Sequence, residues 1–321
     1  MQKFLLRWTT AAALLLAFSP VARAEYPDRP VRLIIPFPPG GSNDVVGRLV
    51  AQQLSIKLGQ QVYVDNRAGA GGTIGTEACA TAAPDGYTIC VISIAHAVNP
   101  ALYTLKYDPI KSFTAISIFA TGPNVLVVNP TSPIRSVKDL VALAKEKPGE
   151  LNYASAGVGS FQHLGAELFK LQANVNLTHV PYKGGGPAMQ DVIAGHVKIM
   201  FSSLVQTTPF IKSGQLIALG TGGAERSPVL PDIPTIAEAG VPGYVADNWW
   251  GLAAPAGLPQ PIIDKLYAAT QAALKAPELQ AQFEREGAAT VVMTSAEFAD
   301  YIKTEITKWG RVVKEGNIHA Q

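Results

Sequence analysis

The sequence lacks the features that mark several large classes of protein. Its two cysteines are too few for a disulfide scaffold, and its 29 glycines follow no three-residue collagen period. Beyond residue 24, no apolar run approaches the roughly 20 residues of a membrane helix. Only 16% of the 321 residues are charged and 48% are hydrophobic, which excludes a disordered chain. This length allows about two domains of roughly 150 residues each.

Motifs of common catalytic and nucleotide-binding sites are also missing. The sequence has no GxSxG, HExxH or GxxxxGK[ST] motif. Gly69, Gly71 and Gly75 follow a GxGxxxG spacing, which differs from the GxGxxG fingerprint of dinucleotide-binding folds. The five histidines are scattered, which argues against a metal site. We therefore expect no catalytic residue, no cofactor and no metal site.

The first 24 residues have the organisation of a cleavable secretory signal. Lys3 and Arg7 precede an eight-residue apolar core, 11–18, and Ala22-Arg23-Ala24 supplies small residues at the two positions read by a signal peptidase. The alternative, a membrane anchor, would need a longer apolar core. We expect cleavage after Ala24. A lipoprotein anchor is not expected, because the first cysteine is Cys79.

The charge balance argues against a nucleic-acid partner. Cleavage would lower the number of basic residues from 26 to 23 and leave all 24 acidic residues, a net charge of −1. Broad nucleic-acid surfaces need clustered, excess Lys and Arg. An anionic partner must therefore be held by local geometry rather than by the overall field.

The two cysteines, Cys79 and Cys90, allow two interpretations. Export would place them in an oxidising compartment, where a disulfide is plausible. They could equally be two small, buried apolar residues. Their spacing does not match CxxC redox chemistry or a zinc site.

Strands and helices alternate in two separate parts of the chain. In the first part, strands are expected at 31–36, 61–64 and 87–94, with helices at 45–58 and after the glycine-rich 66–75 segment. The second part resumes the alternation from 137 to 221. Such alternation predicts parallel sheets with right-handed crossovers. Two amphipathic helices, 261–274 and 295–316, close the chain.

Extended segments are expected at 116–120 and 124–128, with no helix between them. The chain crosses between the two parts near 122–126 and 244–251. Two crossings form a hinge of the type found in binding proteins that close on a ligand. We expect an α/β protein with residues 25–122 plus 248–321 in a discontinuous first lobe and 123–247 in the second, each lobe built on a mostly parallel sheet.

The loop 38–44 is the first candidate binding element, because it joins the first strand to its helix. Ligands of open α/β sheets bind at such carboxyl ends of strands. Gly40 and Gly41 allow close backbone approach, and Ser42, Asn43 and Asp44 can cap the helix. A helix N-terminus suits a carboxylate or a phosphate. The alternative is a tight capped turn without a ligand.

A similar loop, 154–160, begins a helix in the second part. Gly157 and Gly159 free its backbone, and Ser155 and Ser160 supply hydroxyl groups. His163 lies on the same helix face as Ser160, where it could contact a ligand. The alternative, a partly buried packing histidine, is the more common situation. A Ser160–His163 nucleophile and base is not favoured, because such i, i+3 pairs are common by chance.

Several segments together resemble the Bug-type family, the extracytoplasmic solute receptors of tripartite tricarboxylate transporters. They are Tyr26–Val31 (YPDRPV), Pro36–Gly41 (PFPPGG), Asn66–Gly72 (NRAGAGG), Ala83–Thr88 (APDGYT), Asn152–Gly157 (NYASAG), Val180–Gly184 (VPYKG) and Trp250–Leu252 (WGL). The resemblance covers essentially all of residues 25–318, in order.

This resemblance implies a two-lobed, Venus-flytrap type of periplasmic binding protein without catalysis. It implies a small carboxylated ligand, held between the lobes largely by backbone N–H groups and water, and membrane components of a tripartite transporter as partners. We expect a monomer. The ligand-binding positions implied are Pro39, Gly40, Gly41, Ser42, Asn43, Asp44, Ala156, Gly157, Gly159, Ser160 and His163, and less firmly Thr73, His96 and Ser202.

Two positions differ from the pattern of the family. Ser202 stands where many relatives have Asp, which removes a partner for an ammonium group and disfavours an amino-acid ligand. Phe161-Gln162 replaces a more common serine-rich pair, and the aromatic ring favours an aromatic or longer apolar acid. Exported α/β enzymes and sensory receptors that dock on a membrane kinase remain alternatives.

Overall fold

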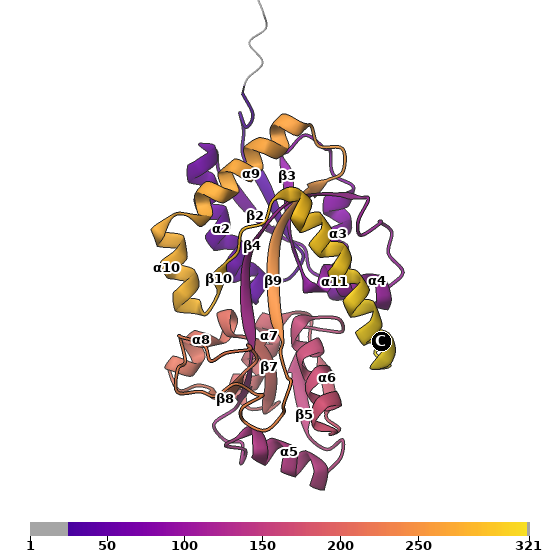
Figure 1. Cartoon of the computed structure of the whole chain (residues 1–321), viewed down its shortest axis with the longest axis vertical. Helices are drawn as coiled ribbons and strands as arrows, with labels where there is room; N and C mark the ends of the chain where they lie inside the picture. The colour runs from indigo at the N-terminus through magenta and orange to yellow at the C-terminus, as the bar shows by residue number, and fades with distance from the viewer. Residues whose placement is uncertain (1–24, 320–321) are drawn as a thin grey trace, which may run out of the picture.

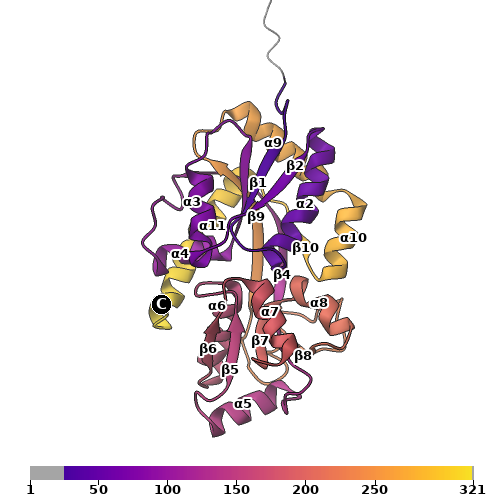
Figure 2. The same ribbon diagram turned by 180° about the vertical axis from the view of Figure 1, so that it is seen from behind.

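A computed structural model describes residues 25–319, which form two lobes joined by a pair of long strands (Figures 1 and 2). The expected signal peptide, residues 1–24, lies outside the described residues. Within the described part, one mixed sheet runs through both lobes in the order β2-β1-β3-β9-β4-β7-β5-β6, with β10 and β8 each paired to β4. The expected two-lobed α/β fold is confirmed.

The first lobe is built around three parallel strands. They are β1 (Val31–Ile35), β2 (Val62–Asn66) and β3 (Thr88–Ser93). Ile34 packs on one face of β1 while Leu33 and Ile35 pack on the other, and all three are fully buried. A parallel strand covered on both faces reads as a continuous apolar run, as VRLII does.

Six helices surround the sheet of the first lobe. They are α2 (Ser42–Leu58), α3 (Thr73–Ala80), α4 (Ile94–Leu102), α9 (Gln260–Leu274), α10 (Pro277–Glu286) and α11 (Ser295–Glu315), with a 3₁₀ turn at Ala70–Gly72 before α3. The buried side chains of α2 recur at helical spacing, and the helix ends at Gly59, which adopts a left-handed φ of 69°.

The second lobe repeats the arrangement on a smaller scale. Its strands are β5 (Asn152–Ser155), β6 (Thr178–Pro181), β7 (Ile199–Ser203) and β8 (Ile217–Thr221), and its helices are α5 (Val137–Glu146), α6 (Phe161–Ala173), α7 (Gly185–Ala194) and α8 (Leu204–Lys212). Strands β5, β6 and β7 are parallel, whereas β4 runs antiparallel to β7 and β8.

The two lobes share strands β4 (Phe113–Val128) and β9 (Asp247–Pro255). Strand β4 pairs with β9 up to Pro123 and with β7 from Asn124 onward. The sequence predicted two separate extended segments here, but they form one 16-residue strand. A second antiparallel pair, Ala289–Thr290 (β10) with β4, borders the hinge.

The C-terminal helix α11 returns to the first lobe. The buried carboxylate of Glu305 accepts hydrogen bonds from the indole N–H groups of Trp249 on β9 (3.0 Å) and Trp309 (2.9 Å). Cys79 at the end of α3 and Cys90 on β3 form a disulfide, with a Cα–Cα distance of 6.2 Å. The hydrogen bonds of Glu305 attach α11 to the first-lobe sheet, and the disulfide attaches α3 to it.

Two helices were absent from the sequence-based expectation, α4 and α10. Helix α4 begins directly where β3 ends, so the apolar run of the strand continues into it and hides the boundary. Helix α10 buries only Leu279 and Phe283, a weak periodic signal. Within residues 25–319, no helix combines the length and the apolar character needed to cross a membrane.

Candidate functional site

The two lobes are in contact across the cleft, in part through glycine backbone. A Cβ atom on Gly186 would lie 2.6 Å from the carbonyl oxygen of Pro39, so these two segments are in close contact across the cleft. The hydroxyl group of Tyr103 on the first lobe donates a hydrogen bond to the carbonyl of Val158 on the second, at 3.1 Å. The structure is therefore a closed arrangement of the two lobes.

Four helices from both lobes begin at one small cavity in the closed cleft. Helix α2 begins after Gly41, α4 after Ser93, α6 after Ser160 and α7 after Gly184. The cavity has a volume of about 10 Å³. Its lining comprises Phe37, Gly41, Ser42, Asn43, Ser93, Ile94, Ala95, Ala156, Ser160, Phe161, Gln162, Gly185 and Asn248.

Helix starts give this cavity a positive electrostatic character without a charged side chain. The first N–H groups of a helix have no partner within the helix, and the helix dipole places partial positive charge there. Two of these helix starts, those of α2 and α4, lie in the first lobe, and two, those of α6 and α7, lie in the second. All of the residues that line the cavity are uncharged. The site therefore suits an anion whose charge is met by backbone N–H groups.

Neutral polar side chains complete the cavity. The Oδ1 atom of Asn43 is buried without a hydrogen-bond partner among the described residues. Gln206 donates to the carbonyl of Gly185 at 2.6 Å and accepts a long hydrogen bond, 3.4 Å, from Gln162. The carboxamide oxygen of Asn248 accepts from the backbone N–H of Trp249. These amides can recognise the uncharged or distal part of a bound acid.

A larger cavity of about 450 Å³ lies on the outer side of the same cleft. It shares Phe37 and Ala156 with the inner cavity and is lined further by the glycine-rich segment 68–72, Tyr103, Tyr182 and Lys183. Lys183 is the only charged residue in its lining. We interpret this space as the entrance to the inner cavity.

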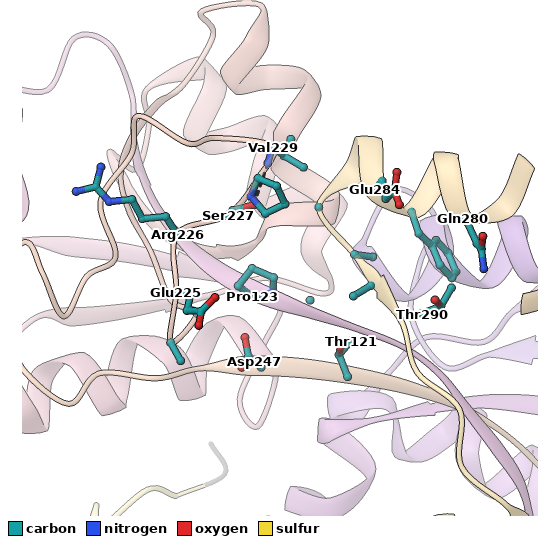
Figure 3. Close-up of a pocket in the computed structure, with 18 residues that line it drawn as sticks. Thr121, Pro123, Glu225, Arg226, Ser227, Val229, Asp247, Gln280, Glu284 and Thr290 are labelled. Atoms are coloured by element: carbon teal, nitrogen blue, oxygen red, sulfur yellow. Dashed lines mark hydrogen bonds between the residues drawn. The ribbon is translucent and has the colours of Figure 1, made fainter. Parts of the chain in front are cut away.

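A third cavity, of about 630 Å³, lies behind the hinge (Figure 3). Thr121 and Asp247 come from the crossing strands, and Glu284 from α10. Three carboxyl groups line it, those of Glu225, Asp247 and Glu284, whereas its one cation, Arg226, is paired with Glu238 at 2.9 Å. Burial raises the pKa of Asp247. An acid-lined cavity repels a carboxylate, so the cleft is the better candidate.

The structure brings five of the expected ligand-binding residues to the inner cavity, and Gly157 to the outer one. The five are Gly41, Ser42, Asn43, Ala156 and Ser160. Pro39 and Gly40 are exposed at the rim of the cleft. Asp44 faces its own loop, because its carboxylate accepts hydrogen bonds from the Gly40 N–H (3.1 Å), Arg48 (2.9 Å) and Asn66 (2.9 Å).

His96 lies away from both cleft cavities. Its Nε2 atom is 2.8 Å from the carbonyl oxygen of Pro109, and its ring packs edge-on against Phe113 at 5.0 Å. Burial lowers the pKa of His96 to about 4. The sequence pattern could not show that His96 lies outside the cleft, because the helix that carries His96 was not predicted.

Four other expected residues also lie outside the lining of the cleft cavities. Thr73 is the first residue of α3. Ser202 is fully buried in β7, and its Oγ atom has no partner among the described residues. Gly159 and His163 are hydrogen-bonded to each other beneath the loop. None of these four residues lines either cleft cavity.

Sequence reasoning missed the contribution of α4. Ser93, Ile94 and Ala95 line the cavity through the start of a helix whose sequence, IAHAVNPAL, contains Pro100 and no charged residue. Gly185 and Asn248 were missed as well, although the GGG run and the position of the second crossing strand point to close backbone approach there. In the described residues, no group of three His, Cys, Asp or Glu side chains could hold a metal ion.

The chain is similar to known proteins. Residues 46–318 match the family described as tripartite tricarboxylate transporter family receptor. The chain is 39% identical to the protein BugT of Bordetella pertussis over 300 residues, which is 92% of each chain.

Solved structures of two bacterial proteins are also similar. The R. palustris protein Rpa4515 with adipate is 36% identical, with a TM-score of 0.89, and the match covers 92% of this chain and all of that one. MatC from Rhodopseudomonas palustris with bound malate is 34% identical, with a TM-score of 0.85 over 90% of this chain and all of that one.

Proposed function

The chain belongs to the tripartite tricarboxylate transporter receptor family, and from this premise we propose that it is a periplasmic receptor for a small organic carboxylate. The ligand binds between the lobes, and the loaded receptor delivers it to the membrane components of a tripartite transporter. The receptor acts as a monomer without a cofactor. Among the described residues, 25–122 and 248–319 form its first lobe, and 123–247 its second.

The convergence of four helix starts on one uncharged cavity is the observation that carries this proposal. Because α2 and α4 belong to one lobe and α6 and α7 to the other, a single carboxylate can contact helix starts of both lobes only when the cleft is closed. The ligand then favours the closed state by its higher affinity for that state, which is how ligand binding drives closure.

The ligand class follows from the lining of the cleft. We propose a di-, tri- or aromatic carboxylate, since relatives of this chain are described with adipate and with malate. No acidic side chain lines either cleft cavity, so an ammonium group would lack a partner. An inner cavity of about 10 Å³ holds roughly one water molecule. The inner cavity must therefore widen to admit the acid.

A thermal-shift panel of mono-, di- and aromatic carboxylates tests the proposal, and calorimetry then measures the affinity of each acid that shifts the melting temperature. A ligand present at 100 times its Kd stabilises the protein by about 2.7 kcal/mol. We expect at least one acid to do so, and the matched amine or amide to have no effect. Stabilisation by cations alone would contradict the proposal.

The alternative of an exported enzyme makes a different prediction. An enzyme would convert its acid, whereas a receptor releases it unchanged. Proton NMR spectra of the best-binding acid, recorded during overnight incubation with the protein, distinguish the two. Export itself is tested by N-terminal sequencing of periplasmic material, which should begin at Glu25. Pull-down with the transporter membrane proteins separates a transport receptor from a sensor.

A further inference from the structure

Two histidines hold the loop 154–160, which is proposed above to bind the carboxylate. The backbone N–H of Gly159 donates a hydrogen bond to the Nδ1 atom of His163, at 3.2 Å and fully buried. The backbone N–H of Gly157 donates to the Oγ atom of Ser155 at 3.0 Å, and that same Oγ atom lies 2.5 Å from Nε2 of His179. Each glycine N–H of the loop is therefore fixed by a side-chain acceptor.

The two imidazoles form part of a stack within the second lobe. The rings of His163 and His179 are parallel, with centroids 4.2 Å apart, and Tyr153 stacks on the other face of His179 at 5.0 Å. His163 is 5% exposed. It lines neither of the two cleft cavities. The ring is therefore placed to support the loop from below.

The hydrogen bond to Gly159 specifies the state of the His163 ring. An Nδ1 atom that accepts a hydrogen bond carries a lone pair, so the proton of a neutral ring must be on Nε2. Nε2 lies 3.8 Å from the Glu167 carboxylate, which also accepts hydrogen bonds from Tyr153 (2.7 Å) and Lys170 (2.8 Å). Since Lys170 balances Glu167, no free anion faces His163 to favour its charged form.

Burial of the ring, together with the nearby Lys170, lowers the pKa of His163 to about 4. Burial and the adjacent His163 ring likewise lower the pKa of His179 to about 3. Both rings are therefore neutral at neutral pH. A protonated His163 would place an N–H group on Nδ1, facing the N–H of Gly159, and the loop would lose its anchor.

We propose that His163 is a positioning residue of the carboxylate site, in which the neutral ring acts as the acceptor that fixes the Gly159 end of the loop and so sets the direction of the N–H groups at the start of α6. This inference rests on the function proposed above for the same site. It changes the expected role of His163 from ligand contact to support. His179, through Ser155, fixes the other end of the loop.

The first test is made without ligand, so that it stands even if the proposed ligand class is wrong. Long-range ¹H–¹⁵N NMR correlations of the histidine side chains report which ring nitrogen carries the proton. We expect His163 with its proton on Nε2 at pH 7, and a pKa well below 6.5. A proton on Nδ1 at pH 7, or titration near 6.5, would overturn the inference.

The second test compares two variants in calorimetric titrations with adipate at pH 7. His163→Phe keeps a stacking ring but removes the acceptor, and we expect adipate affinity to fall by about 10-fold, the effect of one unsatisfied buried donor. His163→Asn restores an acceptor, Oδ1, close to the position of Nδ1 and cannot be protonated; its affinity should lie within about threefold of wild type. His196→Asn, at an exposed histidine of the same lobe, is the matched control.

Rescue by Asn and not by Phe supports the positioning role, because a general packing role would give the opposite order. Equal affinity of wild type and His163→Phe, with both proteins folded by circular dichroism, would contradict it. If adipate binds to none of the proteins, the ligand class fails, and the NMR measurement still decides the role of His163.

Discussion

Ser42 and Ser160 hold similar places in the two lobes, but the structure gives them different roles. Both line the inner cavity at the start of a helix. Ser160 is the N-cap of α6, and its hydroxyl oxygen accepts a hydrogen bond from the His163 N–H at 3.4 Å. Helix α2 has Gly41 as its N-cap, without a side-chain cap, so the Ser42 hydroxyl does not cap its helix.

These roles predict different effects of removing each hydroxyl group. Ser42→Ala should weaken carboxylate binding by about 0.5–1.5 kcal/mol, the net value of one hydrogen bond, and leave the free energy of unfolding unchanged. Ser160→Ala should weaken binding similarly and also lower the free energy of unfolding by about 1 kcal/mol, because the cap is lost. Calorimetry and urea denaturation measure the two effects. Wild-type affinity in Ser42→Ala would remove this residue from the site.

At the scale of single residues, the sequence located the cavity-lining loops better than the individual side-chain contacts. The proposed site uses backbone N–H groups, which every residue type except proline offers, so only the glycine-rich loops before α2 and α6 pointed to it. The start of α4 gave no such signal, because Ser93 ends a strand and Ile94 begins a helix without a loop between them. His96 was expected in the cleft because helix α4, which carries it, was not predicted.

Among the structural elements, the β5–α6–β6 unit contains two histidines, His163 and His179, whose pKa values are lowered in the folded protein. His163 is neutral in the folded protein, with a pKa lowered to about 4, whereas the unfolded chain binds a proton near pH 6.5. The unfolded state therefore takes up more protons than the folded state between these two values. Stability is fully present above pH 6.5 and is lost as the pH falls toward 4.

This difference predicts acid destabilisation that depends on His163. Between pH 6.5 and pH 4, His163 alone should account for a loss of about 3 kcal/mol in the free energy of unfolding. Urea denaturation of wild type and His163→Asn over this range measures it, since the Asn variant cannot titrate. The two curves of stability against pH should diverge as the pH falls. Parallel curves would show that folding does not lower the pKa of His163.

Most elements of the fold followed from periodicity, and the exceptions have physical reasons. The parallel strands were found because buried strands are continuous apolar runs. Strand β4 was predicted as two pieces, because the Thr121-Gly122-Pro123 segment between them reads as a break in sequence. Pairing with β9 on one side of that point and β7 on the other holds it as one strand. Pairing between strands that are distant in the sequence produces no local sequence pattern from which it could be predicted.

For the whole molecule, the contact of the closed lobes depends on the absence of a side chain at Gly186. A Cβ atom there would lie 2.6 Å from the Pro39 carbonyl oxygen on the opposite lobe, while the residue itself lies in helix α7 without a positive φ angle. Alanine is therefore compatible with the helix but not with full closure. In a Gly186→Ala protein, each lobe can therefore keep its fold while the two lobes are held slightly apart.

Gly186→Ala is accordingly expected to weaken ligand binding by about 10-fold or more without lowering the free energy of unfolding, because alanine favours the helix. Gly310→Ala in α11, where a Cβ would meet no atom within 4 Å, is the matched control and should bind as wild type does. Small-angle X-ray scattering with saturating ligand should show a larger radius of gyration for Gly186→Ala. An unchanged affinity would mean that binding does not need this contact.

The arrangement of the whole chain was partly predictable. Two extended crossings implied a hinge, and the returning C-terminal helix implied a discontinuous first lobe. The contacts that hold α11, in which two tryptophans share the buried Glu305, were not predictable, because these residues are distant in sequence and carry no motif.

The central claim is that one carboxylate binds where the helices α2, α4, α6 and α7 begin, between the closed lobes. A crystal structure of the protein with the acid selected by the thermal-shift panel tests this claim most directly. The account predicts one carboxylate group within about 3.2 Å of backbone nitrogens at the starts of helices from both lobes. A ligand bound in the acid-lined cavity behind the hinge, or held by one lobe alone, would contradict the account.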